Sequence, residues 1–329
     1  MAATSKLRWG ILGVAKINNR IVPGFRASPR ADLVAIASRD VARARESART
    51  WNLQVAHGSY EALLDDPGID AVYIPLPNTL HAEWTRKAAD RGKHVLCEKP
   101  LTPTASEAAE LVAYCRNKKV QLMEGFMWPH HPRTSRIRRV IDSGAIGSVQ
   151  RVTGTFTFLL PIEPANIRLQ PALAGGSLLD VGCYPVYGIR WAFGAEPVGV
   201  YARSRYEHGV DVALNGMVWL ADGRTASFDC GFTQPIRPWL EISGTAGSIF
   251  VPEMWVPGPR ASYLVRREGH DPEEIVVEGE NQIANMINGF SRSILEGTPV
   301  RPSADEAVRT LRVLDALATS AREGKEVSV

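Results

Sequence analysis

The stretch LRWGILGVAKIN, residues 7–18, passes from an apolar, β-prone run through a glycine into a segment with a helical pattern. In a dinucleotide-binding fold the turn after the first strand is glycine-rich, because backbone N–H groups and the helix N-terminus must approach a pyrophosphate. Here Gly13 is followed by Val14, Ala15, Lys16 and Ile17, so only the first glycine of that pattern is present. Read alone, the stretch fits a plain tight turn as well as a phosphate-binding one. Its surroundings must decide.

Strand and helix patterns alternate around this stretch as far as residue 124. We predict strands over residues 7–12, 32–38, 71–74, 94–97 and 120–123, and helices over 17–27, 41–51, 81–91 and 106–117. Asp40 is the expected N-cap of the second helix. Alternating β and α units form a parallel sheet with helices on both faces. The sequence therefore predicts a Rossmann-type doubly wound α/β domain over residues 1–124, which would bind a dinucleotide.

The pattern changes after residue 125. A basic helix over 134–143 is followed by strands over 149–160, 198–204, 212–220, 225–232, 239–243, 248–251 and 263–267, and helices over 283–295 and 304–322 end the chain. Asp222-Gly223 is typical of a hairpin turn. Successive strands without crossover helices predict an α+β domain with a large, mostly antiparallel sheet over residues 125–329. Because few helices are available to cover both sheet faces, we expect this substrate-binding domain also to form a homodimer or homotetramer.

Composition excludes several functional classes. The 329 residues include 38 Lys and Arg against 35 Asp and Glu, a net charge of +3, which argues against a nucleic-acid partner. The four cysteines are scattered without a CxxC pair, and the histidines lack ligand spacing, so no metal site is predicted. No run approaches the roughly 18 apolar residues of a membrane span. We expect a cytoplasmic protein without a membrane partner.

The residues after the second strand indicate which cofactor binds. An NAD-binding site places an acidic residue there to hold the ribose 2′-hydroxyl. This chain has Ser38 and Arg39, with Arg43 one helical turn further on. A hydroxyl and guanidinium groups suit a 2′-phosphate. The sequence therefore predicts NADP(H).

Two further segments lie at the carboxyl ends of predicted strands, where ligands of such sheets bind. They are IPLPNTLH (74–81) and the EKP that begins at residue 98. Lys99 precedes Pro100, so its backbone is kept extended and its side chain is expected to point into the site. Glu98 is expected to help place the nicotinamide side of this turn. The predicted cofactor contacts in the two segments are Pro75, Leu76, Pro77, Asn78, His81, Glu98 and Lys99.

The second domain contributes GGSLLDVGCYP, residues 175–185. Asp180 and Tyr184 are four residues apart, hence on one face of a helix. Hydride transfer at a carbinol carbon requires a proton to move on its oxygen, and a phenol with a pKa of about 10 needs a nearby cation to serve near neutrality. Lys99 could supply that cation. Alternatively, Ser177 and Asp180 fit a capping box, and Tyr184 fits a core residue.

Two other candidates remain open on residue type alone. The pair His130-His131 suggests a substrate-facing histidine more than a metal ligand. Arg168, in NIRLQ (166–170), could contact substrate hydroxyls or a phosphate, or could simply be exposed.

Taken together, the degraded glycine turn, the EKP after the strand over residues 94–97 and the GG-x-LLD-x-G-x-Y segment resemble the Gfo/Idh/MocA oxidoreductases over essentially the whole chain. The resemblance implies that Lys99 is the catalytic lysine, that Pro100 forms a tight and often cis turn, and that Asp180 and Tyr184 complete the site. Tyrosine, where many members have histidine, is similar to the dihydrodiol and xylose dehydrogenases and the nucleotide-sugar 3-ketoreductases, which commonly use NADP(H).

The segment MEGFMWPHHPR (123–133) also looks like the ketoreductase branch, and it adds Trp128 and His130 to the expected substrate contacts, beside Lys99, Arg168, Asp180 and Tyr184. Ala15 and Asn18 depart from the usual phosphate-binding pattern, as in other NADP-using members.

The function expected from these residues is NADP(H)-dependent hydride transfer to or from a secondary alcohol or ketone of a sugar-like substrate. Trans-dihydrodiols and inositols form an alternative substrate class. A non-catalytic NADP-binding sensor of the same fold is the alternative function. Retention of Lys99, Asp180 and Tyr184 together favours the enzyme, because a sensor has no need of a proton relay.

Overall fold

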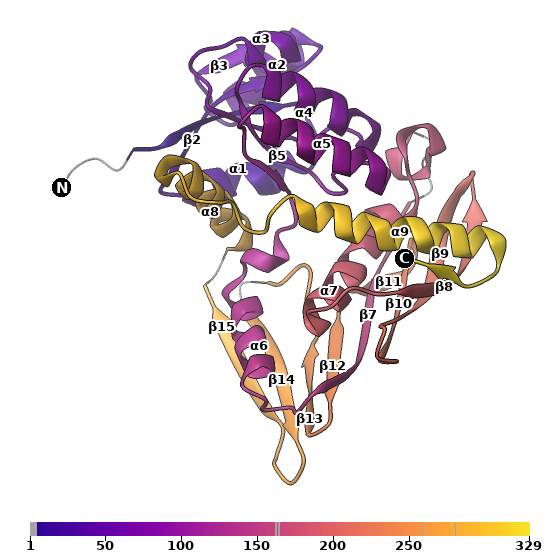
Figure 1. Ribbon diagram of the computed structural model, residues 1–329. Helices are drawn as coiled ribbons and strands as arrows, with labels where there is room; N and C mark the ends of the chain where they lie inside the picture. The colour runs from indigo at the N-terminus through magenta and orange to yellow at the C-terminus, as the bar shows by residue number, and fades with distance from the viewer. Residues whose placement is uncertain (1–4, 162, 164, 259, 280) are drawn as a thin grey trace. The chain divides into compact units, whose positions relative to one another are not determined.

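A computed structural model of the chain describes residues 5–161, 163, 165–258, 260–279 and 281–329 (Figure 1). The chain divides into two compact units, Met1–His130 with Asn281–Val308, and His131–Glu280 with Arg309–Val329. The sequence-based division at residue 124 assigned the 281–308 segment to the second domain, whereas here that segment belongs to the first unit.

The first unit is a six-stranded parallel sheet in the order β3-β2-β1-β4-β5-β6. This order is that of a dinucleotide-binding fold, so the predicted doubly wound domain is confirmed. Its strands are β1 (Leu7–Leu12), β2 (Ala31–Ala37), β3 (Val55–His57), β4 (Ala71–Ile74), β5 (His94–Cys97) and β6 (Leu122–Glu124). Its helices are α1 (Asn18–Ala27), α2 (Val41–Thr50), α3 (Tyr60–Leu64), α4 (His81–Asp90), α5 (Ala105–Asn117) and α8 (Gln282–Glu296), with short 3₁₀ turns at Asn78–Leu80 and Trp128–His130.

Trp9 of β1 explains why α8 belongs to this unit. The indole is fully buried, and its ring centroid lies 5.1 Å from that of Phe25 on α1 and 5.3 Å from that of Phe290 on α8. Its Nε1 donates a hydrogen bond of 3.0 Å to Ser291 Oγ, also on α8. Helices α1 and α8 lie side by side (Figure 1). A segment remote in sequence thus completes the core of the first unit.

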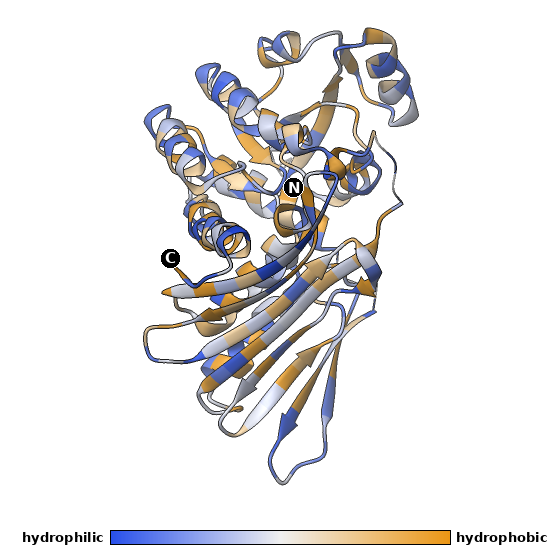
Figure 2. Cartoon of the chain, turned by 90° about the vertical axis from the view of Figure 1, so that its right-hand side faces the viewer, coloured by the Kyte–Doolittle hydropathy of each residue, from blue (hydrophilic) through white to orange (hydrophobic). Residues whose placement is uncertain are grey.

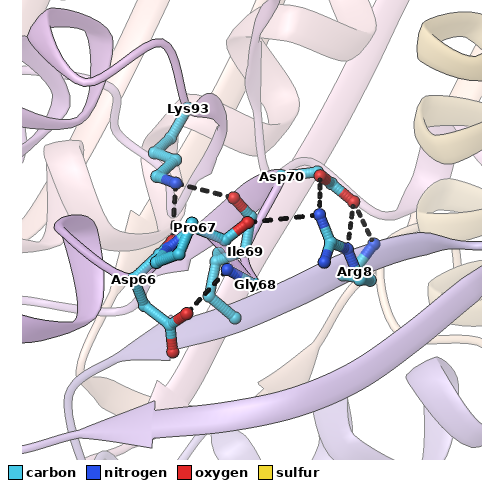
Figure 3. Close-up of polar contacts among 7 residues, drawn as sticks. All are labelled: Arg8, Asp66, Pro67, Gly68, Ile69, Asp70 and Lys93. Atoms are coloured by element: carbon cyan, nitrogen blue, oxygen red, sulfur yellow. Dashed lines mark hydrogen bonds and ion pairs between the residues drawn. The ribbon is translucent and has the colours of Figure 1, made fainter.

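A polar cluster fastens the starts of three parallel strands (Figure 3). Arg8 of β1 pairs with Asp70, which precedes β4, at 2.8 Å. Lys93, which precedes β5, is buried and donates through Nζ to the carbonyls of Asp66 (2.8 Å) and Ile69 (2.7 Å). Burial lowers the pKa of Lys93 below its ordinary value. The cluster fixes the sheet edge opposite to the one where parallel strands bind ligands.

The second unit is built on a ten-stranded sheet in which β7 and β10 are parallel neighbours and all other pairings are antiparallel. The predicted large, mostly antiparallel sheet is therefore confirmed. Its strands are β7 (Val149–Leu159), β8 (Gly199–Glu207), β9 (Val210–Trp219), β10 (Thr225–Gly231), β11 (Thr233–Arg237), β12 (Leu240–Gly244), β13 (Gly247–Val251), β14 (Arg260–Arg267), β15 (Glu273–Glu278) and β16 (Val327–Ser328). Its helices are α6 (Pro132–Asp142), α7 (Cys183–Phe193) and most of α9 (Asp305–Glu323), with 3₁₀ turns at Ile167–Leu169 and Pro171–Leu173 and a π-helical turn at Leu178–Gly182.

One face of this sheet is covered by helices. Gly154 on β7 lies opposite Phe228 on β10, which in turn lies opposite Gly216 on β9, so the three share a face. A Cβ on Gly154 would lie 3.3 Å from Pro185 of α7, and one on Gly216 would lie 3.1 Å from Leu317 of α9. Helices α7 and α9 therefore pack on the same side. Hydrophobic and hydrophilic residues alternate along the strands (Figure 2).

Several short elements were not predicted from the sequence. They are β3, α3, β11, β15 and β16. Each is at most six residues long, and β3 and β15 contain exposed or half-exposed residues where a buried strand would be apolar. The pairing partners of the four strands, rather than their own patterns, make them strands. Among the helices that the structure describes, none is both long and apolar enough to cross a membrane.

Candidate functional site

The glycine turn after β1 has the backbone geometry that the sequence leaves open. Gly13 adopts a φ of +127°, where side-chain-bearing residues are strained, and a Cβ there would lie 3.0 Å from Leu76. The Asn18 side chain donates to Gly13 O at 2.8 Å, and the residue is fully buried. Asn18, which in the sequence looks like a departure from the phosphate-binding pattern, thus ties the turn to the first residue of α1. Val14, Ala15 and Ile17 are half-buried, and Lys16 is exposed.

The residues after β2 lie as expected for a phosphate-binding turn. The Asp40 carboxylate accepts from the Ala42 amide at 2.8 Å, which confirms Asp40 as the N-cap of α2. Ser38 is buried, and its Oγ accepts from the Asp40 amide at 3.2 Å. Arg39 and Arg43 are exposed. The guanidinium groups of Arg39 and Arg43 and the N-terminus of α2 therefore lie within a few residues of one another in sequence, just after the end of β2.

His81 joins the loops that follow β4 and β5. It is fully buried, with Nδ1 2.8 Å from the carbonyl oxygen of Pro100 and Nε2 2.7 Å from that of Leu76. Burial lowers the pKa of His81 below its ordinary value. The sequence suggests His81 as a cofactor contact, whereas the structure places it behind the two loops, which it holds together. Leu76 and Pro75 are buried, and Pro77 and Asn78 are half-buried.

Glu98 is anchored beside Lys99. Its Oε1 accepts a 2.6 Å hydrogen bond from the hydroxyl of Tyr73 on β4, and its Oε2 accepts from the Lys99 amide at 3.3 Å. Burial raises the pKa of Glu98 above its ordinary value, while the neighbouring Lys99 opposes that rise. The Lys99–Pro100 peptide bond is cis. Tyr73 is a contributor that the sequence analysis missed, because a tyrosine inside an apolar strand carries no signal of its own.

These strand ends fit a dinucleotide. The turn at Gly13 has no side chain at the position nearest Leu76, and Asn18 Oδ1 is a buried polar atom without a hydrogen-bond partner within the described ranges. Exposed Arg39 and Arg43 provide cationic donors at the β2 end. The arrangement suits a phosphate-bearing ligand at the carboxyl edge of the sheet.

The second unit holds the other candidate residues on one helical segment. Leu178–Gly182 forms a π-helical turn that continues into α7, so Asp180 and Tyr184 lie about one turn apart. Arg168 Nε donates to Asp180 Oδ2 at 2.6 Å. Arg168, open from its sequence to an exposed or a substrate-binding role, is thus bonded to the carboxylate of the predicted relay. Gly175 permits this arrangement, because a Cβ there would lie 2.5 Å from Arg168 O.

Tyr184 lies among aromatic side chains of the second unit. Its ring centroid is 5.0 Å from that of Phe156 in an edge-to-face contact and 6.0 Å from that of Trp255. The residue is 9% exposed, so the packing fixes the ring without burying it completely. Lys99 belongs to the first unit, whereas Asp180 and Tyr184 belong to the second.

The structure places three further residues that the sequence analysis singled out. Ser177 makes no capping bond to its own helix and instead donates to Asp211 Oδ2 at 2.6 Å, so the capping-box interpretation is wrong. Trp128 is fully buried, which does not suit a direct substrate contact. His131 Nδ1 accepts from the Arg133 amide and caps α6.

His130 Nε2 is buried without a partner in the part of the chain that the structure describes, and burial lowers the pKa of His130 to about 4. Within the same residues no group of three metal-binding side chains occurs.

Comparison with known proteins agrees with both units. Residues 7–126 match the model of an oxidoreductase family with an NAD-binding Rossmann fold, and residues 134–250 match the GFO/IDH/MocA C-terminal domain. The chain is 39% identical over 328 residues to a D-xylose 1-dehydrogenase (NADP(+)) from Haloferax volcanii, covering 98% of this chain and 100% of the relative. It is 34% identical over 255 residues to a trans-1,2-dihydrobenzene-1,2-diol dehydrogenase from Xenopus tropicalis, covering 76% and 77% of the two chains.

A solved structure gives the same result at the level of the fold. The 3-ketoreductase from Actinomadura kijaniata, in complex with NADP and TDP-benzene, superimposes with a TM-score of 0.89 at 33% identity, covering 96% of this chain and 98% of that one. Matches to both domains, together with relatives that align over nearly the full length, show that this chain belongs to the GFO/IDH/MocA family of oxidoreductases.

Proposed function

We propose that this protein is an NADP(H)-dependent oxidoreductase that transfers hydride to or from a secondary alcohol or ketone of a sugar-like substrate. One observation carries the proposal: Asp180 and Tyr184 lie on one helical segment with Asp180 held by Arg168, in a chain that places Lys99 in the loop just after β5. Relatives that align with it are named as a NADP(+)-linked xylose dehydrogenase and a sugar 3-reductase, which supports both the cofactor and the substrate class.

The first unit would hold the cofactor. NADP(H), when bound, gives or takes the hydride. The backbone of residues 13–17 would contact the pyrophosphate, and Ser38, Arg39 and Arg43 the 2′-phosphate. The loop of residues 75–78 and Glu98 would contact the nicotinamide half, with His81 holding that loop from behind.

The remaining residues would handle the proton and the substrate oxygen. Tyr184 would give the proton to the oxygen during reduction and take it during oxidation. Lys99 would orient the same oxygen and favour the phenolate through its positive charge. Asp180, held by Arg168, would complete the relay. Trp128, expected from the sequence to contact the substrate, is fully buried and would not contact it directly, whereas half-buried His130 stays a proposed substrate contact.

The substrate class remains a small carbohydrate-like molecule, with trans-dihydrodiols and inositols as the alternative. The likeness to a dihydrodiol dehydrogenase supports testing that class. We further propose that the protein works in the cytoplasm without nucleic-acid or membrane partners, with the second unit supplying substrate-binding and self-association surfaces.

Single-turnover hydride transfer tests the proposal in both directions: reduction of NADP(+) by aldoses, inositols and trans-dihydrodiols, and oxidation of NADPH by nucleotide ketosugars. Tyr184→Phe should lower turnover by about 10²–10⁴-fold, the usual contribution of general acid–base catalysis. Lys99→Met should be similarly impaired, and the double variant little worse than either single one, because groups that act as a unit are not additive.

Tyr187→Phe is the matched control, since it removes a hydroxyl from the same helix three residues further on. It should retain wild-type turnover, and thermal melts should show all variants folded. Wild-type hydride transfer in Tyr184→Phe would contradict the relay. Tight NADPH binding without turnover on any substrate would favour the sensor.

A further inference from the structure

A carboxylate outside the predicted relay holds the helix on which the relay lies. Asp211, at the start of β9, accepts two hydrogen bonds at its Oδ2 atom. One comes from the Leu178 amide at 2.7 Å and the other from Ser177 Oγ at 2.6 Å. The first amide groups of a helix have no partner inside the helix, so they need an acceptor from elsewhere. Asp211 supplies that acceptor from a position 33 residues away in sequence.

The contact is built into the glycine pair of the GGSLLDVGCYP segment. Gly176 has a φ of +114°, and a Cβ there would lie 2.2 Å from Asp211 Oδ1. Any larger residue would displace the carboxylate. Gly175 likewise leaves room for Arg168, because a Cβ on Gly175 would lie 2.5 Å from the Arg168 carbonyl oxygen. Gly176 therefore leaves room for Asp211, which bonds the segment at Leu178. Gly175 leaves room for Arg168, which bonds it at Asp180.

The environment of Asp211 shows that its carboxylate is committed to this contact. Burial raises the pKa of Asp211 above its ordinary value, and the bonds from Ser177 and Leu178 oppose that rise. A buried carboxylate is costly unless its oxygens accept hydrogen bonds. An apolar residue would fill this strand position without the cost of burying a carboxylate. The hydrogen bonds from Ser177 and Leu178 therefore explain why the position is an aspartate.

We propose that Asp211 is a positioning residue for catalysis: by bonding Ser177 and Leu178, it fixes the first turn of the helix and hence the placement of Asp180 and Tyr184. The proposal rests on the proton-transfer role proposed above for that pair. It predicts that loss of Asp211 impairs the chemical step and leaves cofactor binding intact, because the cofactor-binding residues belong to the first unit.

Three variants of the full-length protein test this inference. Asp211→Leu replaces the acceptor with a somewhat larger apolar side chain, Asp211→Ala removes it without added bulk, and Asp211→Asn keeps an amide oxygen that can accept both bonds. Asp229→Ala is the matched control, because Asp229 is an aspartate of the same sheet that pairs with Arg237 and Thr155. Turnover, NADPH affinity and hydrogen exchange of the 178–184 segment are measured well below each melting temperature.

We expect Asp211→Leu to lower turnover by about 10- to 100-fold, the effect of a small misplacement of reacting groups, with NADPH affinity unchanged. Exchange at residues 178–184 should accelerate, and Asp211→Asn should restore most of the turnover. If Asp211→Leu does not fold, Asp211→Ala is judged by the same criteria. A folded acceptor-free variant with wild-type turnover would overturn the proposal, as would equal damage in Asp211→Asn and Asp211→Leu. Wild-type turnover in Tyr184→Phe would instead overturn the relay, so the two failures are distinguishable.

Discussion

Two side chains from outside the 178–184 segment hold it in place at the residue scale. Arg168 bonds the Asp180 carboxylate, and Asp211 bonds the Leu178 amide. Asn18 plays a comparable part in the first unit, where its side chain closes the turn at Gly13. In each case a segment expected to meet a ligand is fixed by a side chain that lies outside that segment.

Arg39 gives the residue-scale prediction on cofactor choice. It is exposed at the end of β2, where a 2′-phosphate would add one charge-assisted contact. NADPH should therefore bind at least about tenfold more tightly than NADH, equivalent to about 1.4 kcal/mol. Fluorescence titration should show that Arg39→Ala removes most of this preference. Arg49→Ala, at the far end of α2, should retain it; equal affinities in the unchanged protein would contradict the prediction.

At the scale of elements, the parallel sheet is fixed at both ends by different means. The loops at its carboxyl edge are joined through His81, and the strand starts at the other edge are joined through Arg8 and Lys93 (Figure 3). Helix α8 packs into the core of the first unit, because Gly24 of α1 leaves room for Ile283 of α8. A Cβ on Gly24 would lie 2.4 Å from the Cγ2 atom of Ile283. The strands whose carboxyl ends would bind the cofactor therefore depend on contacts far from those ends.

Lys93→Met tests the strand-start cluster. The substitution would leave the Asp66 and Ile69 carbonyls without their buried donor, which should lower the free energy of unfolding by about 1–3 kcal/mol. Urea unfolding measures the change, and NADPH affinity should be little altered. Lys6→Met, at an exposed lysine just before β1, should unfold like the unchanged protein. Equal stability of the two variants would show that the cluster contributes nothing.

At the scale of the whole molecule, the sheet face opposite α7 and α9 is the expected self-association surface. Pairing across the sheet places on that face one row made of Tyr201, Met217, Ser227, Thr153, Glu241, Phe250 and Leu264. Met217 is 46% exposed and Leu159, further along β7, is 64% exposed. Large apolar residues exposed on one sheet face favour a protein–protein contact.

We expect a dimer or tetramer in sedimentation at micromolar concentration. Met217→Glu combined with Leu159→Glu should shift it toward monomer, because each buried charge would lack a partner. Val55→Glu, at an exposed valine on β3 of the first unit, should leave the assembly unchanged. A monomeric unchanged protein would rule the expectation out.

At the same scale, we expect His130 to make the stability of the folded protein sensitive to mild acid. Burial lowers the pKa of His130 to about 4. Below about pH 6.5 the His130 side chain is therefore protonated in the unfolded chain but stays neutral in the folded protein. The resulting loss of stability is absent above that pH and grows as pH falls toward 4, by up to about 1.4 kcal/mol per pH unit. His130→Gln should therefore flatten the fall in unfolding free energy between pH 6.5 and 4.5. His208→Gln, at an exposed site, should not, and identical slopes would contradict the assignment.

Local chemistry determined much of this protein from the sequence alone. Periodicity placed most strands and helices of both units, Asp40 was identified as a cap by its position before α2, and the Asp222-Gly223 turn joins β9 to β10 with Gly223 at a φ of +86°. These features depend on residues a few positions apart. The candidate relay residues were also proposed from motifs, because Lys99-Pro100 and the Asp180/Tyr184 spacing are local.

Tertiary structure alone decided what holds those residues. The bonds of Asp211 to Leu178 and of Trp9 to Ser291 join positions 33 and 282 residues apart, and no local pattern encodes such a pairing. Membership of α8 in the first unit and the pairing of β3 and β15 are likewise set by packing. An aspartate at a strand start or a serine in a helix has many possible partners. Only the folded chain selects one, because burial makes an unpaired polar group too costly to leave.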